Sequence, residues 1–75
     1  MNKHEERVLI SRGCALMRSR LRIRNNEIKK LRGLEREVHD FVTAASINGL
    51  SLHDAERNLN ISVSLSIEEH LQNGT

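Results

Sequence analysis

The sequence predicts an all-α fold, in which a long amphipathic helical region or a pair of helices precedes two short helices. Aliphatic side chains recur at three- and four-residue spacing from Ile10 to Ala45, which is the period of one helix face. The chain contains no proline, which is the residue that breaks a helix most strongly. Asn48 and Gly49 form a helix stop signal, and Ser51 follows as a helix start.

The length of 75 residues allows one small domain, which we place at 1–75. A domain of this size buries only roughly 60% of the surface that its unfolded chain exposes, so its core is marginal. We therefore expect copies to associate. The single cysteine, Cys14, excludes a disulfide framework and favours a cytoplasmic protein. No apolar run is long enough to span a membrane, so we expect no membrane partner.

The long helical region is expected at 3–47. One aliphatic stripe in it follows heptad spacing, which is typical of a coiled-coil seam that joins two copies in a homodimer. Gly13 lies within the stripe's span and costs about 1 kcal/mol relative to alanine. At Asn25-Asn26, one continuous helix and a helical hairpin both remain possible. The predicted dimer interface consists of Ile10, Cys14, Met17, Leu21, Ile28 and Leu31.

Two short helices are expected within 51–71. Ser51 can accept a hydrogen bond from the amide three residues later, as a helix cap does. A turn at 60–62 should separate the two helices. Apolar residues alternate with serines over 60–67, so a strand is the alternative for that segment. Residues 72–75 should form a frayed tail.

Positive charge concentrates in the first half of the chain. Residues 1–36 hold eleven basic and four acidic side chains, a net charge of +7, whereas residues 37–75 hold one basic and six acidic side chains. Such asymmetry indicates a nucleic-acid-binding segment or two halves that attract each other between subunits. The plain alternative is a solvated charged face. The cations that we expect to contact phosphate are Arg18, Arg20, Arg22, Arg24, Lys29, Lys30, Arg32, Arg36 and Arg57.

The second half of the chain resembles a LuxR-type helix-turn-helix segment. The run LEREV at 34–38 is similar to the family's first motif. The residues similar to its second motif are Gly49, Ser51, Ala55, Leu59, Ile61, Ser62, Ile67 and His70.

The resemblance, which covers residues 34–73, implies that the helix after the turn enters the DNA major groove. Ser62 and Ser64 would then start that recognition helix. The chain differs from the family pattern at Glu56, where a small residue is usual. It also differs at Glu68 and Glu69, whose charges repel phosphate.

These observations predict a small DNA-binding transcriptional regulator that acts as a dimer, of the size that phages and plasmids encode. The alternative is a non-enzymatic adaptor, anti-regulator or inhibitor that binds an acidic protein surface through its helices. We expect no catalysis, metal or cofactor, because no glycine-rich phosphate loop occurs and the histidines are scattered. The histidines are His4, His39, His53 and His70.

Overall fold

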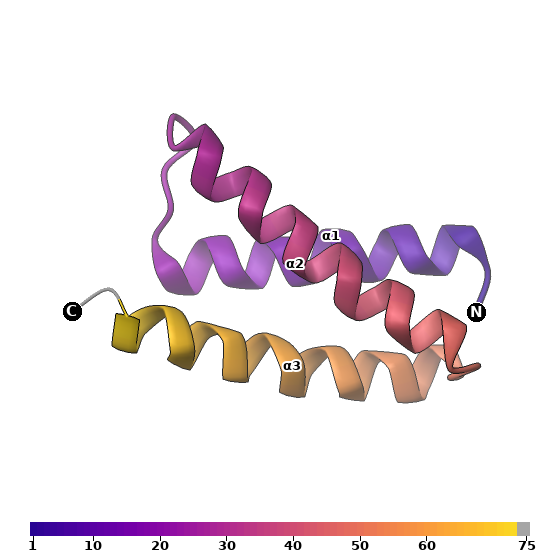
Figure 1. Cartoon of the computed structure of the whole chain (residues 1–75). Coiled ribbons are helices and arrows are strands. Elements are labelled where there is room, and N and C mark those ends of the chain that lie inside the picture. The colour runs from indigo at the N-terminus through magenta and orange to yellow at the C-terminus, as the bar shows by residue number, and fades with distance from the viewer. Residues whose placement is uncertain (74–75) are drawn as a thin grey trace.

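The computed structural model describes residues 1–73, which fold into three helices. These are α1 (Lys3–Leu21), α2 (Ile28–Ile47) and α3 (Leu52–Asn73). Helices α1 and α3 run in the same direction, and α2 runs back across them, so that each helix packs against the other two (Figure 1). No strand occurs within residues 1–73. The all-α prediction is confirmed, and the N-terminal region is a helical pair.

Helix α1 begins with a capping box and ends in a left-handed turn. The Asn2 Oδ1 atom accepts a hydrogen bond of 2.8 Å from the Glu5 amide, and Glu5 Oε1 accepts one of 2.9 Å from the Asn2 amide. At the other end Arg22 has φ 55°, and the Ile23 amide donates to the Arg18 carbonyl at 3.1 Å. These bonds close the last turn, so the helix stops before Asn25.

The predicted stop and start between α2 and α3 are present. Gly49 has φ +72°, where glycine carries no steric penalty, and the Leu50 amide donates to the Ala45 carbonyl at 3.1 Å. Ser51 Oγ then accepts a hydrogen bond of 3.3 Å from the Asp54 amide.

The prediction of two short helices within 51–71 is wrong, because α3 passes through 60–62 without a turn. The strand alternative for 60–67 is also wrong. The buried residues of α3 explain the continuity: Ala55, Leu59, Val63 and Ile67 recur at four-residue spacing and form one apolar row. Of the tail expected at 72–75, Gln72 and Asn73 continue α3, and 74–75 lie outside the described residues.

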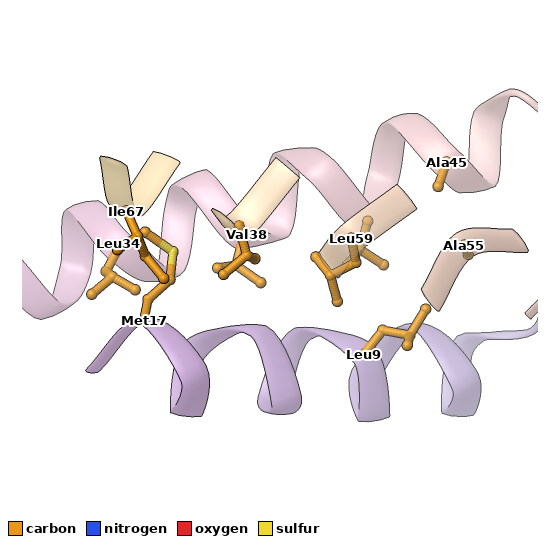
Figure 2. Close-up of a cluster of buried hydrophobic side chains, with 10 residues drawn as sticks. Leu9, Met17, Leu34, Val38, Ala45, Ala55, Leu59 and Ile67 are labelled. Carbon is orange, nitrogen blue, oxygen red and sulfur yellow. The ribbon is translucent and has the colours of Figure 1, made fainter. Parts of the chain in front are cut away.

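The core is built from such four-residue rows in all three helices (Figure 2). Helix α1 contributes Leu9, Gly13 and Met17, a row that steps by four rather than by the heptad pattern. Gly13 is buried where the helices meet, since an added Cβ would lie 2.6 Å from Val38 Cγ1 and 3.5 Å from Leu59. The other core residues are Leu34, Val42, Ala45, Ala55, Val63 and Ile67.

The stripe predicted to join two copies therefore packs largely inside its own chain. Met17 has 0% exposure, and Ile10, Cys14 and Leu21 pack against the core. The reason is the chain reversal after Leu21, which brings α2 back over α1 where a second copy was expected. Of the six predicted interface residues, Leu31 is half-buried and only Ile28 is largely exposed, at 57%. Homodimerisation itself stays a prediction.

Among residues 1–73, no helix combines the length and the apolar character needed to cross a membrane.

Candidate nucleic-acid interface

The chain reversal gathers the basic stretch at one end of the bundle. We call this surface the basic hairpin end. It draws on the last turn of α1, the connection and the first half of α2, and lies at the end where α3 finishes (Figure 1). All of its cations are exposed. The basic hairpin end consists of Arg18, Arg20, Arg22, Arg24, Lys29, Lys30, Arg32 and Arg36.

The connection is held in place at both sides of its turn. Ile23 is half-buried and packs against the core. The Arg18 guanidinium donates a hydrogen bond to the Asn25 side-chain carbonyl, and the Glu27 amide donates to the Arg24 carbonyl at 3.1 Å. The Arg18–Asn25 bond joins α1 to the connection, and the Glu27–Arg24 bond closes a turn within the connection.

On α2 the basic residues lie opposite the core. With about 100° per residue, Lys29, Arg32 and Arg36 fall on the side facing away from Leu34 and Val38. The three basic residues are exposed, and Leu34 and Val38 are buried, as this helix wheel predicts. The result is a cationic outer face on α2 that continues from the connection.

Acidic partners are few at this end of the molecule. Within residues 1–73, Lys30 alone among the eight cations forms an ion pair, with Glu27 Oε2 at 3.0 Å. The hydrogen bond from Lys30 lowers the pKa of the Glu27 carboxyl. The other seven cations have no carboxylate within ion-pair distance in the described part of the chain, so their charge remains available to an external anion.

Three predicted site residues do not join this surface. Arg57 lies in the first half of α3, a helix that begins at the opposite end of the bundle (Figure 1), and its Nη2 is 3.5 Å from His53 Nε2. Ser62 is half-buried and donates to Asn58 Oδ1 at 3.5 Å. Ser64 is exposed, but it lies inside the continuous α3 rather than at the start of a helix.

Sequence reasoning missed an apolar groove beside the basic hairpin end. Its volume is about 670 Å³, and it opens between the ends of α1 and α3 and the first half of α2. No local pattern indicated it, because its lining comes from three segments far apart in the sequence. The lining residues are Leu21, Ile23, Lys30, Gly33, Leu34, Glu37, His70, Leu71 and Asn73.

A polar network joins α2 to α3 at the edge of this groove. Glu37 accepts a hydrogen bond from the hydroxyl of Ser66, which is only 4% exposed. The other Glu37 oxygen lies 3.1 Å from His70 Nε2. The network satisfies Ser66, the one buried polar side chain within residues 1–73.

No group of three or more His, Cys, Asp or Glu side chains in residues 1–73 is placed to hold a metal ion. Burial raises the pKa of the Cys14 thiol, Glu35 raises it further, and Arg18 opposes both. A thiol with a raised pKa is mostly protonated at neutral pH and is a poor nucleophile.

No protein-family model, curated protein or solved structure matches this chain.

Proposed function

We propose that this chain is a small DNA-binding protein that holds the phosphate backbone with its basic hairpin end and acts as a dimer in transcriptional regulation. The observation that carries the proposal is the gathering of eight exposed cations, seven of them without a carboxylate partner within residues 1–73. Six of the eight are arginines, and the planar guanidinium matches phosphate oxygens through two parallel hydrogen bonds.

An apolar groove adjoins the basic hairpin end, but the outer face of α2 carries few apolar side chains, which favours a polyanion over a protein partner at that face. Protein interfaces rely on buried aromatic and aliphatic anchors. The outer face of α2 offers Ile28 at its first turn, the cations Lys29, Arg32 and Arg36, and the exposed Asp40 one turn beyond them. Phosphate binding needs charge and exposed donors, which this face has, and it needs no apolar anchor.

Backbone contact is supported more strongly than base reading. The LuxR-type resemblance implies base contacts from Ser62 and Ser64, yet both lie within one continuous helix. Glu68 and Glu69 follow on the same helix and are exposed, so they would repel phosphates beside any groove that α3 entered. In our proposal the affinity comes from phosphate contacts, which position a protein on DNA without reading its sequence.

The decisive experiment is a salt titration of duplex DNA binding with two matched triple variants. The first replaces Lys29, Arg32 and Arg36 by Gln, which removes three cations from the basic hairpin end. The control replaces Lys3, Arg7 and Arg12 by Gln, which removes the same charge from exposed positions outside the basic hairpin end. Each phosphate contact contributes a slope of about 0.9 to log K against log salt. We expect the first variant to flatten that slope by two to three contacts (roughly 1.8–2.7) and the control to leave it nearly unchanged.

Three outcomes would contradict the proposal. The wild type could fail to bind duplex DNA even at low salt. The two triple variants could weaken binding equally, which would indicate a net-charge effect without a defined surface. The first variant could keep its DNA binding while losing an acidic protein partner, which would assign the surface to the adaptor function. Replacing Ser64 by Ala tests base reading separately, since a loss of preference among sequences would restore that role.

A further inference from the structure

The solvent face of α3 carries two exposed aliphatic residues on neighbouring turns. Ile61 is 56% exposed and Leu65 is 60% exposed. With about 100° per residue, both fall within about 20° of the direction opposite Val63, which is buried in the core. This face is not used by the bundle and lies outside the basic hairpin end.

We propose that a second copy of this chain covers this face, with the two α3 helices packed antiparallel about a two-fold axis at the level of Val63. Residues equally far before and after Val63 then lie opposite each other. Ile61 meets Leu65 of the partner subunit, and the symmetric contact repeats it, so four aliphatic side chains form one cluster. The inference specifies the dimer of the proposed function. The role of that dimer rests on the proposed DNA binding, whereas its geometry does not.

Charge complementarity identifies the occupant as a second copy. Arg57 and Glu68 lie on one flank of the aliphatic pair, about 20° apart on the helix wheel. Arg57 is six residues before Val63 and Glu68 is five after it. Because equal flanks adjoin in an antiparallel pair, Arg57 lies beside the partner subunit's Glu68, and symmetry makes this contact twice.

The same charges disfavour a parallel pair. In that arrangement opposite flanks adjoin, so Glu68 would lie beside the partner subunit's Glu69 at the same level, and like charges would repel. Arg57 would then face Asn58 of the partner subunit and gain no carboxylate. The face is therefore self-complementary in one orientation only, which is the property that a two-fold interface requires.

Small side chains flank the aliphatic pair. Around the helix, Ser62 and Ser64 lie about 80° to either side of the aliphatic pair, and small flanking residues allow two helix axes to approach closely. The arrangement leaves Lys29, Arg32 and Arg36 of both copies exposed, because they lie on the outer face of α2. A dimer of this kind presents two basic hairpin ends and thereby doubles the phosphate contacts of one molecule.

The test is sedimentation equilibrium of the full chain without nucleic acid, so that its result does not depend on the proposed DNA binding. We expect the wild type to have twice the monomer mass of 8.6 kDa at micromolar concentration. Leu65→Glu should weaken the dimer by at least about tenfold, since it places two like charges in the aliphatic cluster. Ile47→Glu is the control, because Ile47 is 79% exposed and lies outside the interface.

Charge reversal tests the orientation directly. Arg57→Glu and Glu68→Arg should each weaken the dimer by about tenfold, because each turns two attractions into two repulsions. The double variant Arg57→Glu/Glu68→Arg should restore the wild-type dissociation constant. A monomeric wild type, a Leu65→Glu variant that still dimerises, or a double variant no tighter than the single variants would each overturn the proposal. Helix content by circular dichroism confirms that each variant is folded.

Discussion

Gly13 and Gly33 show that one residue type has opposite consequences in two neighbouring helices. A Cβ at Gly13 would lie 2.6 Å from Val38 Cγ1, and Val38 is fully buried and has a stiff β-branched side chain. A Cβ at Gly33 would meet nothing within 4 Å. The glycine that sequence reasoning treated as a helix weakness is therefore a requirement of the packing.

This contrast predicts that replacement by alanine has opposite effects on the free energy of unfolding at the two glycines. Gly13→Ala should lower the free energy of unfolding by about 1–3 kcal/mol, because overpacking outweighs the gain in helix propensity. Gly33→Ala should raise it by about 0.5–1 kcal/mol through propensity and chain entropy. Thermal unfolding followed by circular dichroism measures both, at roughly 4–8 °C for each kcal/mol in a chain of this size. A stabilising Gly13→Ala would show that the three helices are not in close contact there.

Arg22 has a backbone conformation that is unusual for a residue other than glycine. It has φ 55°, in the left-handed region that glycine adopts without penalty. We expect Arg22→Gly to raise the free energy of unfolding by about 1 kcal/mol, because it removes that strain. The same change should weaken DNA binding, since it removes one cation of the basic hairpin end. Arg20→Gly is the control, because it removes a neighbouring charge from regular helix and should lower stability by about 1 kcal/mol.

At the scale of the elements, the helix ends differ in how far the sequence predicts them. The stop at Asn48 and Gly49 and the start at Ser51 were predictable, because each uses a residue type with a specific local hydrogen bond or backbone angle. The end of α1 was not, since Arg22 carries no sign of a left-handed turn. There the reversal depends on Ile23 reaching the core, which is a tertiary effect.

The continuity of α3 illustrates a competition between two patterns. The run Asn60-Ile61-Ser62 predicted a turn, and the alternation of apolar residues with serines over 60–67 offered a strand as the alternative. The row of Ala55, Leu59, Val63 and Ile67 favours one helix, and it prevails because all four side chains are buried in the core. Of the candidate site, the cations were predictable from composition. Their gathering at one end was not, because it depends on where α1 ends.

At the scale of the whole molecule, the small core makes each buried residue decisive. A chain of 75 residues has a free energy of unfolding of about 4–11 kcal/mol. Three helices share one apolar cluster, so no helix retains a separate core if another is lost. Loss of packing at one buried position should therefore unfold the whole chain in a single transition.

Met17 provides the sharpest test of this cooperativity, because the heptad pattern placed it between copies and the structure places it inside one. It is 0% exposed, so Met17→Glu buries a charge without a partner, at a cost of about 3–5 kcal/mol. We expect the melting temperature of this variant to fall by at least about 12 °C, since each kcal/mol corresponds to roughly 4–8 °C in a chain of this size. Ala15→Glu, an exposed change on the same helix, should leave the helix content intact. If Met17→Glu instead gave a monomer with the wild-type melting temperature, the residue would lie between copies, and α1 would belong to a dimer seam. If it is strongly destabilised while Leu65→Glu keeps its melting temperature and is monomeric, the core and the interface lie where the structure and our inference place them.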